Sequence, residues 1–439
     1  MSQSSNSKVH RAPRLSVECL EDRITPVFLT QPQALTGGLP GFSTVNGVSQ
    51  NTGGLSIAAG DLYPDNVPNQ AGAFVENEFV VGFGPGPESQ VGIFGRDGKL
   101  RGSFTPFPGF TGGVNVAVGD VLGDSRAEII VTPASNALPI VAVFTPQGRL
   151  LSAFMVMTPL YTGGLNVAVG NVLGGIGAGG YNGGFTREEQ DAYQSLFGVN
   201  VSNQFKQEII VGTSTLSSRV VVTDGVGNVQ RDFFAFDPLY NGGVTLTAAS
   251  VDKRRDPGFT FQAGQEDTAS YDEIIVGAAS QAPLVRVYDV WQGGANLTQN
   301  FFAFPATIGM GVNVAAGPSD FIRGAEIYVN LLGTSIIRTF DGETQEQLAQ
   351  TQVFPPQYSH GLNMATGFFS NTTAFPAGTT VPPSGFYDPT DDSTFFNNFG
   401  VDNPDFLIQD LVVVSADGPF FQQPRLYTGG LNPAPLNGP

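Results

Sequence analysis

Cysteine and histidine are scarce in this sequence. Cys19 is the single cysteine among 439 residues, so no disulfide can form within the chain, and the disulfide framework of small secreted domains is excluded. The two histidines are His10 and His360, which excludes a metal centre built from several His or Cys ligands. No motif marks a nucleophile and an acid for His360, so a catalytic triad is not indicated.

Positive charge and long apolar runs are also scarce. Lys and Arg together number 20 against 38 Asp and Glu, a formal net charge of −18. Such acidity disfavours binding to nucleic acid and to anionic membranes. No apolar run approaches the ~20 residues that span a bilayer, and the N-terminus lacks the ~7–15-residue apolar segment of a conventional secretory signal. We expect a soluble protein with a polar N-terminal tail.

Glycine, proline and phenylalanine are abundant, with 57, 31 and 35 residues respectively. Frequent turn residues between short runs of Val, Ile, Thr and Phe are typical of all-β proteins.

One pattern recurs six times and organises the chain. Its anchors begin GGLSIAAGD at 53, GGVNVAVGD at 112, GGLNVAVGN at 163, GGVTLTAAS at 242, GMGVNVAAG at 309 and HGLNMATG at 360. After each anchor comes an apolar strand that opens with an acid. These acids are Glu78, Glu128, Glu208, Glu273, Glu326 and Asp410. A third strand and a Phe-rich fourth strand follow, so the repeat is a unit of four short strands.

The length of the repeat varies mainly in one loop, between the first and second strands. Anchors lie 50 to 79 residues apart, and this loop spans 8 to 42 residues. Without its excess over eight residues, the spacing is 50 to 53 residues. A four-stranded unit of this length with insertions on one face predicts a β-propeller blade. The insertions are expected at about 62–77, 172–207, 251–272 and 368–409.

The ends of the chain favour a closed ring of six blades. The sixth repeat ends after its third strand, PRLYT at 424–428, and residues 27–52 could supply its fourth. Pairing of the two ends removes exposed strand edges. Seven blades are the alternative, if residues 27–52 and the C-terminal tail form a further sheet. We therefore predict a tail at 1–26 and a single propeller at 27–439.

The stretch GGVNVAVGDVLGDSRAEIIV at 112–131 resembles the FG-GAP (integrin-α-like) propeller repeat, and similar copies cover about residues 50–430. The resemblance implies a propeller whose loops often bind calcium through carboxylates at positions 1, 3, 5 and 9. In the second repeat Asp120, Asp124 and Glu128 occupy positions 1, 5 and 9, whereas Leu122 occupies position 3. The other repeats lack most of these ligands.

A second resemblance lies in the tail. The stretch LSVECLEDRITP at 15–26 is similar to a short motif near the N-termini of predicted surface proteins of planctomycete bacteria. The matching residues are Glu18, Leu20, Glu21, Arg23 and Pro26. The motif implies export or display at the cell surface.

The acid that opens each second strand is present in all six repeats, although its possible calcium partners are lost. This favours a structural role, in which the carboxylate accepts backbone N–H groups of the loop or of the neighbouring blade. Weak calcium binding by Asp120, Asp124 and Glu128 is the alternative, with a dissociation constant of ~10⁻⁴ to 10⁻³ M. No other cofactor is expected.

Two classes of function fit these patterns. The first is a non-enzymatic extracellular or cell-surface scaffold or adhesion module that binds a protein or glycan through the insertion loops, because rigid scaffolds present binding residues on loops. The second is an extracellular polysaccharide hydrolase or lyase on the same fold. An enzyme needs titratable groups that converge in one pocket, and no motif marks such a group, so the scaffold is favoured.

Overall fold

The computed structural model divides the chain into Met1–Pro32 and Gln33–Pro439. It describes residues 54–63, 77–95, 100–123, 126–173, 207–251, 272–291, 293–317, 325–354, 359 and 361–367, together with the backbones of short strands elsewhere in the second unit. The tail and most of the insertions therefore lie outside the described residues.

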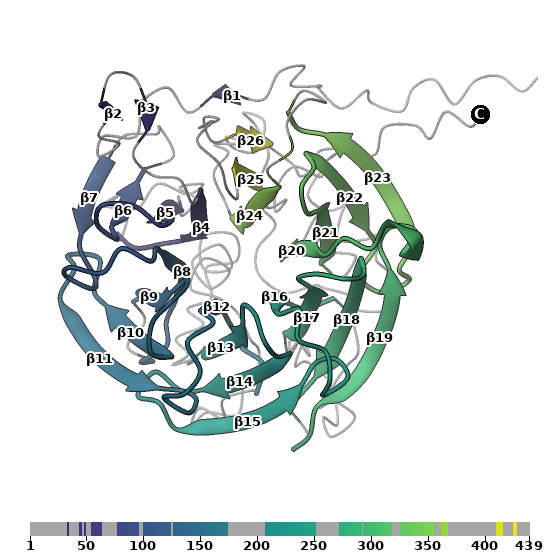
Figure 1. Cartoon of the computed structure of the whole chain (residues 1–439), viewed down its shortest axis with the longest axis horizontal. Coiled ribbons are helices and arrows are strands. Elements are labelled where there is room, and N and C mark those ends of the chain that lie inside the picture. Colours follow the sequence, from purple (N-terminus) through teal and green to yellow (C-terminus); the bar gives the residue numbers. More distant parts are fainter. Residues whose placement is uncertain are drawn as a thin grey trace, which may run out of the picture. The chain divides into compact units, whose positions relative to one another are not determined.

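Five consecutive four-stranded antiparallel sheets confirm an all-β propeller, and we call them blades one to five (Figure 1). Blade one contains β4 (Leu55–Gly60), β5 (Glu78–Phe83), β6 (Val91–Phe94) and β7 (Leu100–Phe104). Blade two contains β8 (Val114–Gly119), β9 (Glu128–Pro133), β10 (Ile140–Phe144) and β11 (Leu150–Met155). Blade three contains β12 (Leu165–Gly170), β13 (Glu208–Thr213), β14 (Arg219–Thr223) and β15 (Val229–Phe234). Blade four contains β16 (Val244–Ala249), β17 (Glu273–Ala278), β18 (Leu284–Asp289) and β19 (Asn296–Phe302). Blade five contains β20 (Val312–Gly317), β21 (Glu326–Leu331), β22 (Ile336–Phe340) and β23 (Gln347–Gln352), preceded by the 3₁₀ helix η1 (Ala306–Ile308).

The position of each strand within its blade follows from its sequence. Second strands such as β9 and β13 are apolar and rich in β-branched residues, and they are buried along their whole length, as expected for strands covered on both faces. Outer strands such as β15 alternate between exposed and partly buried residues. In Figure 1 the first strand of each blade lies innermost and the fourth lies outermost.

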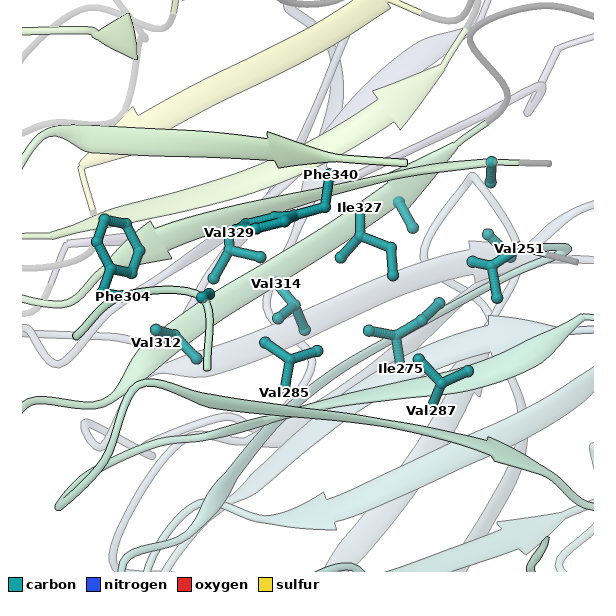
Figure 2. Packing of buried hydrophobic residues seen from close by; sticks show 14 of the residues in the cluster. Val251, Ile275, Val285, Val287, Phe304, Val312, Val314, Ile327, Val329 and Phe340 are labelled. Carbon is teal, nitrogen blue, oxygen red and sulfur yellow. The ribbon is translucent and has the colours of Figure 1, made fainter. Parts of the chain in front are cut away.

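The hydrophobic core lies between adjacent blades. Between blades four and five, Val285 and Val287 of β18 pack in one cluster with Val312 and Val314 of β20 (Figure 2). The cluster also takes in Ile275, whose side chain is fully buried. Each blade is therefore stabilised mainly by its neighbours.

A row of polar side chains joins the innermost strands. The second residue of β8, Asn115, donates through Nδ2 to the carbonyl of Leu165 at 2.8 Å and to Oδ1 of Asn166 at 2.9 Å. Asn166 in turn donates to the carbonyl of Val244 at 2.6 Å. Equivalent bonds run from Thr245 to Val312, from Asn313 to Leu362 and from Asn363 to Leu55 at 2.9, 2.8 and 2.7 Å. Each first strand lies at the edge of its sheet. These side-chain bonds therefore satisfy backbone carbonyl groups that point away from the neighbouring strand.

Arginine on a third strand forms another contact between blades. The Arg286 guanidinium lies 5.2 Å from the ring centroid of Phe236, and its Nη1 donates to the carbonyl of Ala235 at 2.9 Å. The Arg338 guanidinium lies 4.5 Å from the ring centroid of Phe304, and its Nη1 donates to the carbonyl of Ala303 at 2.9 Å. Both arginines reach back to the preceding blade, which combines a cation–π contact with a hydrogen bond.

Near the chain ends, a further sheet has the strand order β1-β26-β25-β24. Its strands are β1 (Gln33–Ala34), β24 (Leu362–Gly367), β25 (Asp410–Ser415) and β26 (Arg425–Tyr427). Two residues of β1 pair with β26, and β2 (Thr44–Val45) pairs with β3 (Val48–Ser49). The number of blades and the closure of the ring stay predictions. Among the described residues, no helix is long and apolar enough to span a membrane.

Candidate functional site

The acid that opens the second strand lies at the base of the variable loop. In blade two Glu128 pairs with Gly119, the last residue of β8. Its side chain is buried, and Oε2 accepts the N–H of Val121 at 3.1 Å. The carboxylate therefore holds the first residues of the loop against the strand where the loop ends.

The same bond recurs in blades whose loops differ greatly in length. Glu78 accepts from Leu62 at 3.0 Å, Glu208 from Val172 and Leu173 at 3.0 and 3.2 Å, and Glu273 from Val251 at 2.9 Å. All of these carboxylates are buried, where hydrogen bonds to a charged acceptor are strong. We call this contact the loop-base clamp.

The loop residues that would face Glu326 and Asp410 lie outside the described part of the chain. Oε2 of Glu326 accepts the hydroxyl of Tyr328 at 3.0 Å. Asp410 pairs with Gly367 as the first residue of β25, whereas its side chain lies outside the described residues.

The residue before the acid contacts the preceding blade. The N–H of Gln207 donates to the carbonyl of Asp120 at 2.8 Å, and its Oε1 accepts the N–H of Asp120 at 3.0 Å. Asp272 forms the same pair of bonds with Asn171, at 3.0 Å through its N–H and 2.8 Å through Oδ2. We call this two-bond contact the joint clasp. Ala325, which has no side-chain acceptor, makes only the backbone bond, to Ser250 at 2.7 Å.

The two side chains that complete a joint clasp differ in charge. Gln207 is neutral, whereas Asp272 carries a carboxyl group. Burial raises the pKa of Asp272 to about 6, and the N–H of Asn171 opposes part of this shift. Desolvation dominates because it penalises the charged form more than one hydrogen bond stabilises it. Asp272 therefore titrates closer to neutral pH than an exposed aspartate.

The calcium hypothesis can be examined only in part. Oδ1 of Asp120 accepts the N–H of Gly123 at 2.6 Å, and Oε2 of Glu128 is used by the loop-base clamp. Asp124 lies outside the described residues. Among the residues that are described, no group of three or more His, Cys, Asp or Glu side chains could hold a metal ion. One oxygen of each of the Asp120 and Glu128 carboxylates already accepts a backbone N–H, and calcium binding stays a prediction.

Several sequence predictions lie outside the described residues. They include the motif residues Glu18, Leu20, Glu21, Arg23 and Pro26, and nearly all of the insertions. Sequence reasoning also missed three contacts that the structure shows, namely the row of inner-strand Asn and Thr, the joint clasp and the arginine contact. Only the first occupies a position that is polar in all six repeats, which alignment of the copies could have exposed, whereas the residue before the acid is Ala127 or Ala325 in two repeats and the arginine occurs only in the last three.

Comparisons with known proteins add little to this description. No family model matches the chain, and no curated protein sequence matches it. Among solved structures, the crystal structure of Saccharomyces cerevisiae Sqt1 is 9% identical with a TM-score of 0.36, and the alignment covers 81% of this chain and 70% of that chain. The beta-propeller domain of Myceliophteria thermophila Cps50 (Swd1) is 8% identical with a TM-score of 0.34, covering 66% of this chain and 86% of that chain. Likeness at this level carries no argument about function.

Proposed function

We propose that this chain is a non-enzymatic scaffold propeller that binds a protein or glycan partner through its insertion loops. The observation that carries the proposal is the loop-base clamp. The same carboxylate contact holds loops whose ends lie 8, 17, 23 and 37 residues apart in the sequence. A constant base with variable loops is the arrangement by which rigid folds present different binding residues.

The strand register supports a shared face for the insertions. Gly60 pairs with Glu78, Gly170 with Glu208, and Ala249 with Glu273. Each insertion therefore leaves and re-enters its blade at the same end of the sheet, next to the clamp. Loops anchored in this way would act together on one partner.

The experiment compares the full chain with a variant in which residues 174–206 are replaced by a short Gly-Ser linker, leaving Val172, Leu173 and Glu208 intact. Both proteins are applied to a glycan array and to polysaccharides in solution. The scaffold predicts binding that the variant loses, without release of reducing ends or unsaturated sugars above a heat-treated control. Release by the native chain would instead support the alternative, a polysaccharide hydrolase or lyase, and would overturn the scaffold.

We further propose that the protein is displayed outside the cell or on its surface. The motif at 15–26 supports this through its resemblance to the planctomycete surface-protein motif, and the six repeats support kinship with FG-GAP propellers. Cell fractionation with an intact and a scrambled 15–26 segment tests the location. An unchanged distribution would refute the targeting role of the motif.

Finally, we propose a ring of six blades closed by β1. The hydrogen bond from Asn363 of β24 to Leu55 of β4 supports this, because it repeats the contact made between consecutive inner strands elsewhere. Ala365 also belongs to the hydrophobic cluster around Leu55. A seventh blade between β24 and β4 would separate these residues.

A further inference from the structure

The turns at the end of the blades opposite the insertions form one connected surface. The Tyr161 hydroxyl donates to the carbonyl of Thr215 at 3.1 Å, and the Thr215 hydroxyl donates to the carbonyl of Gly163 at 3.0 Å. Tyr240 makes the equivalent bond to Ser280 at 3.0 Å. These bonds join the turn after a fourth strand to the turn between the next blade's second and third strands. We call the connected turns the turn rim, residues 84–90, 105–113, 134–139, 157–164, 214–218, 236–243, 279–283, 304–311 and 332–335.

Leucine side chains protrude from the turn rim in successive blades. Leu160 and Leu239 are 90% and 92% exposed, and Leu216 is 66% exposed. Single exposed leucines are common on soluble proteins. Here they recur on one surface, on turns held in place by the tyrosine hydrogen bonds, where a polar residue would serve the fold equally well.

Leu216 also has an unfavourable backbone conformation. Its φ is 65°, in the left-handed region, and the equivalent turns have Asn136, Gln281 and Gly333 at φ of 49°, 67° and 73°. Glycine and asparagine suit this conformation better than leucine does. Leu216 is therefore both strained and exposed, so neither burial nor backbone geometry accounts for leucine at this position.

The charges of the turn rim indicate the chemistry of what binds there. Its charged residues, all within the described part of the chain, are Glu88 and Asp237. Both are acidic and exposed, and Oδ1 of Asp237 accepts the N–H of Leu239 at 2.8 Å. The whole chain has a net charge of −18. An anionic membrane and a second copy of the chain would both be repelled, whereas a basic partner would be attracted.

We propose that Leu160, Leu216 and Leu239 form a docking surface for a partner protein that presents a basic amphipathic segment. The leucines bury against the apolar stripe of the segment, and its Lys or Arg residues face the acidic surroundings. This surface lies at the other end of the blades from the insertion loops, so the inference goes beyond the proposed function and does not depend on it.

The experiment uses a fluorescent amphipathic helix of about 18 residues composed of Leu and Lys as the probe. Its affinity for the full chain is measured by anisotropy, with an all-Lys peptide and a Leu–Glu peptide as comparisons. The test variant has three serine substitutions, Leu160→Ser, Leu216→Ser and Leu239→Ser. The matched control removes three exposed apolar side chains of the outer strands, Leu150→Ser, Val229→Ser and Leu297→Ser.

The expected result is that the Leu–Lys peptide binds the native chain and the control equally, and the test variant at least about tenfold more weakly. Binding should also weaken as NaCl rises from about 50 to 500 mM. Leu216→Asn alone should weaken binding while raising the melting temperature by about 1–2 °C, because asparagine relieves the strain.

Three results would overturn the inference. They are equal binding of the peptide to the native chain and the test variant, leucine-dependent binding to phosphatidylcholine vesicles in place of the peptide, and leucine-dependent self-association in sedimentation velocity. A loss of glycan binding on removal of residues 174–206 concerns the proposed function alone, so failure of one can be told from failure of the other.

Discussion

Asp272 and Gln207 occupy equivalent positions at two successive blade joints, and only one of them can carry a charge. Both accept the N–H of the first loop residue of the preceding blade. The neutral amide makes this bond without desolvating a charge, whereas the carboxylate must lose its water. The comparison within one molecule shows that the hydrogen bond does not require the charge.

Asp272→Asn is therefore expected to stabilise the protein at neutral pH. The pKa of Asp272 is about 6 in the folded chain against an ordinary value of 3.8. The folded state binds this proton more tightly, so the contribution of the group to stability is fully present below pH 3.8 and is lost as pH rises through 6. The residue as a whole is half-buried, so solvent screens part of this effect, and the loss amounts to about 1–3 kcal/mol. At pH 7.5 the melting temperature of the variant should be roughly 2–4 °C higher than that of the native chain. This difference should vanish near pH 4.

Glu343→Gln is the control for this measurement, since it removes one negative charge from an exposed turn. An equal gain in both variants would mean that lower net charge stabilises the chain, and it would contradict a specific cost at Asp272.

Calcium is predicted to leave the stability of the chain unchanged, because Leu122 occupies the third ligand position and one oxygen each of Asp120 and Glu128 already accepts a backbone N–H. The melting temperature is compared in EDTA and in about 5 mM calcium. At this concentration, a site with a dissociation constant of about 1 mM would be more than half occupied. Calcium in the site would raise the free energy of unfolding by about 1 kcal/mol and the melting temperature by roughly 1–2 °C. A shift of that size that disappears in the Asp120→Ala, Asp124→Ala double variant would establish the calcium site.

At the scale of strands and blades, the sequence predicted the repeat well because hydrophobic periodicity is local. Alternation and β-branched runs identified the second strands, and the opening acids marked where they begin, as the residue ranges of β5, β9, β13, β17 and β21 show. Contacts between blades could not be derived in the same way, because they join residues that lie, for example, 35 or 101 positions apart in the sequence. Arg286 and Phe236 meet only once two sheets pack, and neither residue alone indicates its partner.

The Arg338–Phe304 contact is expected to couple blades four and five. Burial lowers the pKa of Arg338, which indicates partial desolvation, and cation–π contacts gain strength under that condition. A double-mutant cycle with Arg338→Ala and Phe304→Ala should give a coupling free energy of about 1–2 kcal/mol in urea unfolding. The exposed Arg219–Asp232 pair, with an N–O distance of 2.5 Å, is the comparison and should give about 0.2–1 kcal/mol. A coupling near zero between Arg338 and Phe304 would show that the aromatic ring adds nothing.

At the scale of the whole molecule, strand register extends this pattern to the last repeat. Arg286 pairs with Val276 and Arg338 with Val329, each the fourth residue of its second strand. In β25 the fourth residue, Val413, pairs with Arg425. Phe354 stands in the sequence where Phe236 and Phe304 stand before their arginines. The repetition favours a sixth blade built like blades four and five, with β1 as its outer strand.

Closure of the ring can be tested by a disulfide across the chain ends, because Gln33 lies opposite Leu426 in the register. With Cys19→Ser removing the single natural cysteine, the pair Gln33→Cys and Leu426→Cys should oxidise readily. The bond would close a very long loop, so it should raise the free energy of unfolding by about 4–5 kcal/mol unless the bond is strained. The control pair Gln33→Cys and Tyr427→Cys is shifted by one residue, which turns the second thiol to the other face of the strand. In a seven-bladed ring, residue 33 would instead pair with the C-terminal tail beyond residue 427. If neither cysteine pair oxidises efficiently, the result favours seven blades over six.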